Sequence, residues 1–292
     1  MNTSNIGLIG YGEVGRIFSA GLRPKPGVRS VLAWDIKFKA GVPPEQGGVQ
    51  PQPSMQALCA GSDLVISAVT ASNTLAVAQE AALHIRAGAI FLDLNSASPG
   101  TKQQCAALID AAGAHYVEAG VMTSVPPYGI KVPMLLGGAR AAELAQLLVS
   151  WDMDAKAVSD QLGVASAIKM CRSVMIKGLE ALVIESYTTA RQYGVEDHVL
   201  PTLAETFPSI DWQKQGAYFF SRVVQHGKRR AEEMREAANT VKEAGFDPFM
   251  AAAIADKQQF VADSAADGLF KEIPKDARWQ DYADRLIADR KR

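Results

Sequence analysis

A glycine-rich turn stands near the start of the chain, between an apolar run and a helix-forming stretch. It holds Gly10, Gly12 and Gly15 in the spacing G-x-G-x-x-G. In this spacing the first glycine permits a tight turn, the second lets the backbone approach a pyrophosphate, and the third allows close helix packing. The following helix would offer free N–H groups and its positive dipole end to an anion. The turn therefore indicates a dinucleotide-binding site, which we assign to Gly10, Tyr11, Gly12, Glu13, Val14 and Gly15.

A carboxylate follows this turn at the distance that ribose recognition requires. Asp35 ends the second apolar run, about 20 residues past Gly15, where an acidic side chain accepts hydrogen bonds from the adenosine ribose. It would repel the 2′-phosphate of NADP, whereas the nearby Lys37 and Lys39 would attract that phosphate. We therefore expect NAD as the cofactor, with NADP as the alternative.

Five apolar runs of strand length alternate with helical stretches in the first part of the chain: 5–9, 30–34, 63–69, 89–93 and 115–118. Strands joined by helices of crossover length form a parallel sheet with helices on both faces. Val69 and Thr70 end the run next to the glycine turn, so we expect them to line the cofactor groove. A purely structural role is the alternative for both.

The pattern predicts an α/β protein with two domains. Residues 1–160 form an N-terminal Rossmann domain with a doubly wound parallel sheet, in which the Gly-, Pro- and Gln-rich segment 37–53 is a loop. Residues 161–292 form an all-α domain. Its helices are expected at 164–192, 216–244, 249–267 and 279–291.

The helix at 164–192 is apolar nearly all round, which predicts a helix that is buried on every side. About 130 residues of helices give little material to cover it, so we expect a homodimer that buries part of it.

Lys169 is a charged side chain on this apolar helix. Burial of an ammonium lowers the pKa of a lysine toward the range useful for proton transfer, although a lysine can also extend its head to water. Arg172 and Ser173 follow within one helical turn. Arg172 could hold a carboxylate, or it could form a salt bridge to Glu180 or to the other domain. A helical stretch of alternating charge begins with His226, Lys228, Arg229 and Arg230. We interpret it as a solvated helix face; a patch that reaches the active site from the second domain is the alternative.

The charge balance excludes several classes of partner. Thirty basic side chains offset 31 acidic ones, for a formal net charge of −1, so the field that attracts nucleic acid is missing. No basic stretch precedes an apolar run at the start, and no window reaches the roughly 18 apolar residues of a membrane span. Three scattered cysteines fit neither disulfides nor a metal site. We expect a cytoplasmic protein with no metal, membrane or nucleic-acid partner.

Four segments, in this order and spacing, resemble the β-hydroxyacid dehydrogenase superfamily, which includes 3-hydroxyisobutyrate and 6-phosphogluconate dehydrogenases. They are the glycine turn, residues 93–99 (DLNSASP), residues 116–124 (YVEAGVMTS) and residues 163–169 (GVASAIK). The resemblance implies an NAD(P)-dependent oxidoreductase. It also implies that Lys169 is the general acid and base, and that the turn after 116–121 binds the substrate carboxylate.

The chain departs from the superfamily at the substrate side. Met122, Thr123 and Ser124 stand where the family usually has Ser-Gly-Gly, and Ser173 stands where it has Asn. Ser98 fits a cap for the helix after Pro99. The resemblance, the place of Arg172 on the helix face of Lys169 and the place of Ser96 in a loop at the carboxyl edge of the sheet together give six candidate substrate-binding residues: Ser96, Met122, Thr123, Ser124, Arg172 and Ser173.

Together these features predict hydride transfer between a nicotinamide and a small β-hydroxy acid or its carbonyl form. Imine reduction on the same architecture is an alternative, but those enzymes generally carry another proton donor where this chain has Lys169. A protein that senses the dinucleotide without turnover is a second alternative, and it would have no use for that lysine.

Overall fold

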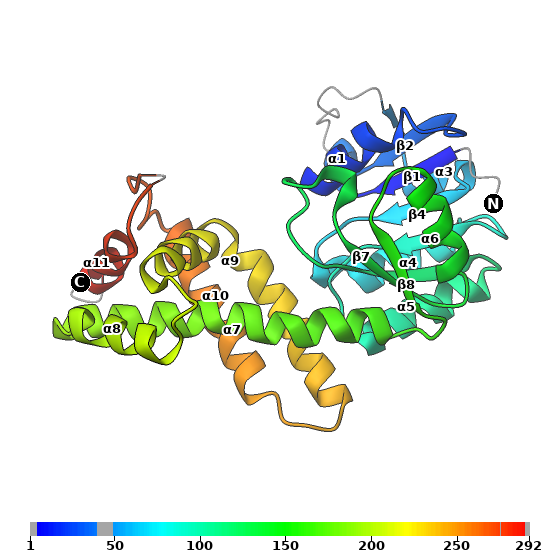
Figure 1. Cartoon of the computed structure of the whole chain (residues 1–292). Helices are drawn as coiled ribbons and strands as arrows, with labels where there is room; N and C mark the ends of the chain where they lie inside the picture. The colour runs from blue at the N-terminus through cyan, green and yellow to red at the C-terminus, as the bar shows by residue number, and fades with distance from the viewer. Residues whose placement is uncertain (1–4, 40–48, 275, 290–292) are drawn as a thin grey trace. The chain divides into compact units, whose positions relative to one another are not determined.

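The computed structural model describes residues 5–39, 49–274 and 276–289. The chain divides into two compact units, residues 1–171 and 172–292 (Figure 1). Each unit is described by itself below.

The first unit is built on one eight-stranded sheet with the strand order β3-β2-β1-β4-β5-β6-β7-β8. Neighbouring strands are parallel except β6 and β7, which are antiparallel. The predicted doubly wound sheet is therefore confirmed as a mainly parallel one. The strands are β1 Asn5–Ile9, β2 Ser30–Trp34, β3 Gln50–Pro51, β4 Leu64–Ser67, β5 Ile90–Asp93, β6 His115–Val121, β7 Met134–Gly137 and β8 Ala155–Ser159.

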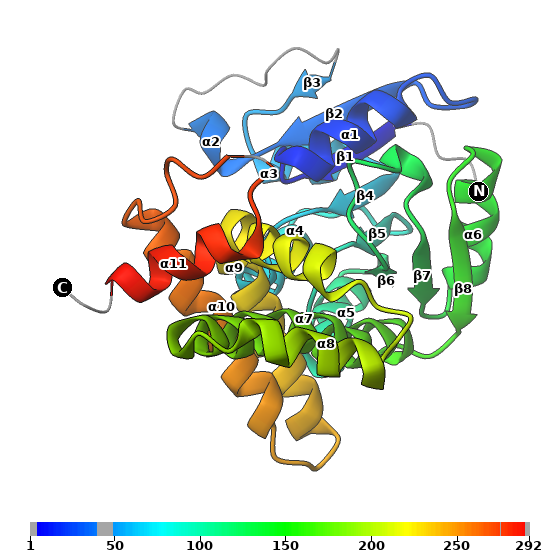
Figure 2. The ribbon, with the colours of Figure 1, turned by 60° about the vertical axis from the view of Figure 1, so that its left-hand side comes forward.

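Helices cover both faces of this sheet (Figures 1 and 2). Successive residues of a strand point to opposite faces; Leu8 belongs to one buried cluster, with Phe18, and Ile9 to another, with Leu58. Two apolar cores therefore hold the sheet between helical layers. The α-helices are α1 Glu13–Leu22, α2 Ile36–Lys39, α3 Met55–Gly61, α4 Thr74–Ala82, α5 Pro99–Ala111 and α6 Ala141–Ser150; short 3₁₀ turns are η1 Ala71–Asn73 and η2 Gly129–Lys131.

Three short strands escaped the sequence pattern. β3 has two residues, β7 has four, and β8 begins Ala-Lys-Ala and so lacks a continuous apolar run. The predicted loop at 37–53 contains α2 and β3 at its ends, and residues 40–48 lie outside the described part.

The described part of the second unit is helical, as predicted. Long α7 begins in the first unit and continues into the second, where α9 and α10 form an antiparallel hairpin (Figure 2). The sequence pattern missed α8 because Pro201 lies inside it, and proline usually ends a helix. No helix among the described residues combines the length and apolar character of a membrane span. The helices are α7 Val164–Tyr193, α8 Glu196–Thr206, α9 Trp212–Glu243, α10 Phe249–Ala266 and α11 Trp279–Asp289.

The expectation that α7 is buried on every side is wrong for the single chain. Ile184 and Tyr187 are fully buried, but Met175 is 74% exposed and Leu182 is 55% exposed. A helix with apolar residues on every face need not be buried on every face within one chain. In this chain α7 keeps an exposed apolar stripe that includes Met175 and Leu182.

Candidate functional site

The glycine turn connects β1 to α1. At two of its positions, Gly10 and Gly15, the structure leaves no space for a side chain. Gly10 has φ +91°, and a Cβ there would lie 2.5 Å from the Ala68 carbonyl oxygen. A Cβ on Gly15 would collide with the carbonyl oxygen of Gly10. Glycine is therefore required for the turn and for the approach of α1 to it, as the spacing predicts.

Gly12 has the opposite surroundings. It stands at the N-terminus of α1, no side chain caps that helix, and a Cβ built on Gly12 would meet nothing within 4 Å. An exposed helix start with the positive end of its dipole uncapped suits a pyrophosphate. The residues at this turn therefore fit a dinucleotide. No group of acidic, histidine or cysteine side chains among the described residues could hold a metal ion.

Asp35 lies directly after β2 and its carboxylate is tied to the glycine turn. Oδ2 accepts a hydrogen bond from the Tyr11 backbone N–H at 2.7 Å, and Oδ1 accepts one from the Lys37 N–H at 2.9 Å. Each carboxylate oxygen has a second lone pair for a ligand hydroxyl. Asp35 is therefore held beside the turn in a fixed orientation.

Asn95, to which the sequence motifs gave no role, joins the ends of two neighbouring strands. Its side chain accepts from the Val69 N–H at 2.7 Å and donates to the Ser67 hydroxyl at 2.9 Å. The Asn95 N–H donates to Asp93 at 2.8 Å, and the residue is buried. Asn95 thus fixes the segment that carries Val69, while the neighbouring Thr70 is exposed. In the sequence, only its position inside the family-like segment 93–99 pointed to a role for Asn95.

A buried ion pair supports the same edge of the sheet. Lys102 Nζ lies 3.1 Å from Asp93 Oδ2, and the Tyr116 hydroxyl donates to that oxygen at 2.6 Å. Burial, with the nearby Asp93 carboxylate, raises the pKa of Tyr116 well above its ordinary value, so the phenol stays a neutral donor.

Two serines follow Asn95 in the loop before α5. Ser96 is half-buried, and Ser98 caps α5 by accepting a hydrogen bond from the Thr101 N–H at 3.2 Å. The predicted capping role of Ser98 is confirmed.

Lys169 is half-buried on the first part of α7 and lies against β6. A Cβ on Gly120 would be 3.4 Å from the Lys169 Cβ and 2.9 Å from the Ala165 carbonyl oxygen. Two residues after Gly120 the chain enters the predicted carboxylate turn, where Met122 and Ser124 are half-buried and Thr123 is exposed. The structure therefore brings Lys169 close to the strand that leads into this turn.

The other predicted substrate residues lie in the second unit. Arg172 is exposed, and the Ser173 hydroxyl accepts a hydrogen bond from Lys177 Nζ at 3.1 Å. Glu180, the alternative partner that we considered for Arg172, forms a buried bidentate pair with Arg230.

The expectation of a solvated face after His226 is wrong at Arg230, which is buried against Glu180. Arg229 follows the expectation, since it is partly exposed and forms an i,i+4 pair with Glu233 at 3.7 Å.

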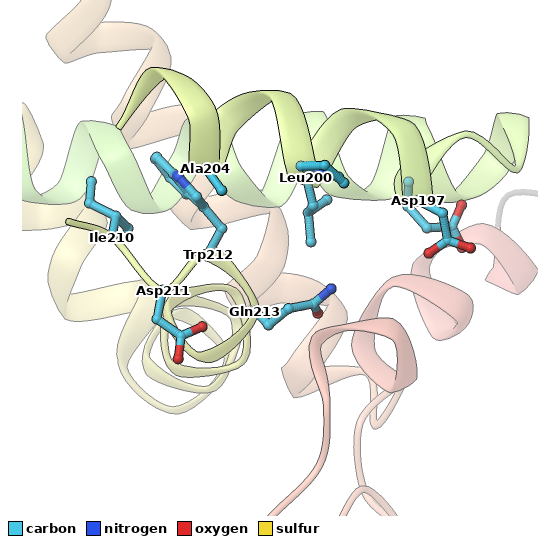
Figure 3. A pocket seen from close by; sticks show the side chains of 9 residues that line it. Asp197, Leu200, Ala204, Ile210, Asp211, Trp212 and Gln213 are labelled. Carbon is cyan, nitrogen blue, oxygen red and sulfur yellow. The ribbon is translucent and has the colours of Figure 1, made fainter. Parts of the chain in front are cut away.

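A cavity of about 320 Å³ lies in the second unit between α8 and the start of α9 (Figure 3). Its wall mixes apolar side chains such as Leu200 and Ile210 with the carboxylates of Asp197 and Asp211. None of the residues that the sequence assigned to the site lines it.

Comparisons with known proteins place the chain in a family. Residues 5–147 match the model of the NAD binding domain of 6-phosphogluconate dehydrogenase. A conserved hypothetical protein from Sinorhizobium meliloti is 35% identical over 99% of this chain and 97% of its own, with a TM-score of 0.76. A conserved protein of unknown function, whose structure was described as similar to 3-hydroxyacid dehydrogenases, is 30% identical over 90% of this chain and 99% of its own (TM-score 0.68). The chain belongs to the β-hydroxyacid dehydrogenase superfamily.

The superfamily assignment confirms the resemblance seen in the sequence, and with it an NAD-binding first domain of the oxidoreductase type. Residues 190–261 match a domain of unknown function, DUF1932. The 3-hydroxyisobutyrate dehydrogenase of Mycobacterium tuberculosis, solved with L-serine, has the same fold at 17% identity, over 97% of this chain and 99% of its own, with a TM-score of 0.70. At that identity the likeness concerns the fold alone.

Proposed function

We propose that this superfamily member transfers a hydride between the nicotinamide of NAD(P) and the carbinol carbon of a small β-hydroxy acid, with Lys169 as general acid and base. The observation that carries the proposal is the position of Lys169, half-buried beside Gly120 where β6 leads into the turn at 122–124. Polar groups that converge at the end of a parallel strand form the usual ligand site of such folds.

The bound dinucleotide would accept or donate the hydride, and the protein's own residues do the rest. The turn from Gly10 to Gly15 and Asp35 hold the cofactor. The Lys169 amine takes the proton of the substrate hydroxyl during oxidation and returns it during reduction. Ser96 and the turn at 122–124, with Arg172 and Ser173, hold the carboxylate and so fix the distance of the carbinol carbon.

The side chains around the carboxylate turn favour an apolar substituent. Met122 and Tyr128 add apolar surface to the segment after β6, and Tyr128 is 52% exposed. A sugar phosphate is best held by several cations, and of the residues we assign to the substrate only Arg172 and Lys169 are basic. We therefore propose a β-hydroxy acid with an apolar or aromatic substituent.

A substrate comparison tests the proposed function. We expect kcat/KM with NAD to be higher for 3-hydroxy acids that carry apolar substituents than for 6-phosphogluconate. Reduction of the matching carbonyl acids, followed by NADH and NADPH consumption, should agree. Turnover of cyclic imines without any hydroxy acid would favour imine reduction, and cofactor binding with no turnover of any compound would favour a sensor.

Asp35 provides a prediction about cofactor choice. In the parent we expect tighter binding of NADH than of NADPH, and Asp35→Ser should shift the ratio of Kd values toward NADPH because the carboxylate no longer repels the 2′-phosphate. Fluorescence titration of both cofactors measures this ratio. Asp35→Asn is the matched control. It removes the charge, as Asp35→Ser does, but its amide oxygen can still accept one of the two hydrogen bonds that Tyr11 and Lys37 donate. Tighter NADPH binding by the parent would show that Lys37 or Lys39 dominates.

We also propose a homodimer that covers the exposed apolar stripe of α7. Met175 and Leu182 place large apolar side chains in water in the single chain, and covering such surface is favourable. Light scattering at micromolar concentration should give twice the 31.2 kDa of one chain. Leu182→Glu should shift the protein toward monomer. A monomeric parent at that concentration would refute the proposal.

A further inference from the structure

Glu118, in the middle of β6, is a fully buried acid that sequence analysis did not assign to the site. Its carboxylate accepts three hydrogen bonds from backbone N–H groups at the start of α7. Oε1 accepts from Gly163 at 2.8 Å and from Ala165 at 3.0 Å, and Oε2 accepts from Ser166 at 3.3 Å. A buried carboxylate thus caps the N-terminus of the helix that carries Lys169, where negative charge is stabilising.

The structure leaves this carboxylate little freedom to move. Gly137 of β7 is paired with Glu118, and a Cβ on Gly137 would lie 2.5 Å from Glu118 Oε1. Asp93, on the neighbouring strand β5, already has a cation in Lys102 of α5, at 3.1 Å. It also accepts a hydrogen bond from the Tyr116 hydroxyl. The acceptor set of Glu118 is therefore directed at α7.

Two residues along the same strand, Gly120 fixes the other side of the contact. Residues i and i+2 of a strand share a face, and the missing side chain of Gly120 lets the Ala165 carbonyl oxygen and the Lys169 Cβ approach the strand. Glu118 holds the first turn of α7 by its N–H groups, and Gly120 sets how closely the next turn packs. Both act on the segment that ends at Lys169.

We propose that Glu118 is the positioning residue for Lys169: it fixes the start of α7 against β6 and supplies a negative charge at the positive end of the helix that carries this lysine. The inference rests on the proposed role of Lys169 as general acid and base. Glu118 itself need not touch the substrate, because it acts through the helix.

Glu118→Gln tests the inference, since the amide keeps the shape but loses the charge and one acceptor oxygen. We expect kcat to fall about 10- to 100-fold, as small misplacements of a catalytic group do, with the Kd of NADH unchanged. The limb of the kcat–pH profile that belongs to Lys169 should move to lower pH, because the variant removes a negative charge that favours the ammonium form. Glu143→Gln, at a partly exposed acid on α6, is the matched control.

A second variant, Gly120→Ala, keeps the inference testable if Glu118→Gln does not fold. Gly120→Ala keeps the Glu118 carboxylate but forces α7 away from β6 at Ala165, so it should also lower kcat at unchanged NADH affinity. A fall in thermal stability for Glu118→Gln and Gly120→Ala, with kcat and the pH profile of the parent, would overturn the inference.

A measurement without substrate separates this inference from the proposed function. The titration midpoint of ¹³C-methylated Lys169, identified by the signal missing in Lys169→Met, should move about 0.5 pH unit lower in Glu118→Gln. An unmoved midpoint would contradict the role of Glu118. Full activity of Lys169→Met would instead contradict the proposed function and leave the midpoint experiment valid.

Discussion

Replacement of Lys169 by methionine is expected to lower kcat by about 10² to 10⁴, the range for the loss of a general acid or base. Methionine has a similar length and no proton to transfer, so the fold and the Kd of NADH should stay unchanged. Steady-state kinetics with the preferred 3-hydroxy acid, with cofactor titration alongside, measure both. The effect follows from the position of Lys169 beside Gly120 at the end of β6.

Lys169→Arg distinguishes proton transfer from charge stabilisation. Arginine keeps a positive charge but does not release its proton near neutral pH, so we expect this variant to be nearly as inactive as Lys169→Met. Lys156→Met, at an exposed lysine of β8, is the control and should be fully active. A Lys169→Met variant within a few-fold of the parent would remove this lysine from the mechanism.

Arg230→Met is expected to be the most destabilising of the substitutions discussed, by about 3 to 5 kcal/mol, because it leaves the buried Glu180 without its cation. The side chains of Arg230 and Glu180 are 9% and 2% exposed, and Arg230 Nε donates to Glu180 at 2.9 Å. Gln258 would still donate to Glu180, at 3.3 Å, but it carries no charge. The free energy of unfolding of the helical unit, followed in denaturant, measures the loss.

Two further variants make this stability prediction specific. Arg229→Met removes a neighbouring arginine whose side chain is 44% exposed and lies 3.7 Å from Glu233, so its effect should stay within about 0.5 kcal/mol. Arg230→Met combined with Glu180→Met should recover most of the stability, because no buried charge is left unpaired. Equal effects of Arg229→Met and Arg230→Met would contradict the assignment of the buried pair.

The cofactor side of the site could be predicted from sequence because its chemistry is local. Gly10, Gly12 and Gly15 act through backbone conformation within a few residues, and Asp35 follows at a spacing that the fold fixes. The role of Ser98 as a cap depends only on the residues just after it. Local rules of this kind need no knowledge of the rest of the molecule.

The supporting residues could not be predicted because their partners are distant in the sequence. Glu118 binds the start of α7 some 45 residues later, and Arg230 lies 50 residues from its partner Glu180. A buried Glu or Arg has the same appearance in sequence as an exposed one. The antiparallel β7 was missed for another reason: its sequence, Met-Leu-Leu-Gly, has no β-branched residue, and methionine and leucine favour helices.

Hydride transfer itself is the central claim, and isotope labelling measures it most directly. The protein is incubated with NAD⁺ and a 3-hydroxy acid that carries deuterium on the carbinol carbon, and the reduced nicotinamide is examined by NMR. We predict deuterium at C4 of the nicotinamide with the parent, and about 10² to 10⁴ slower incorporation with Lys169→Met. Cofactor binding without deuterium transfer from any acid of the series would contradict the proposed function.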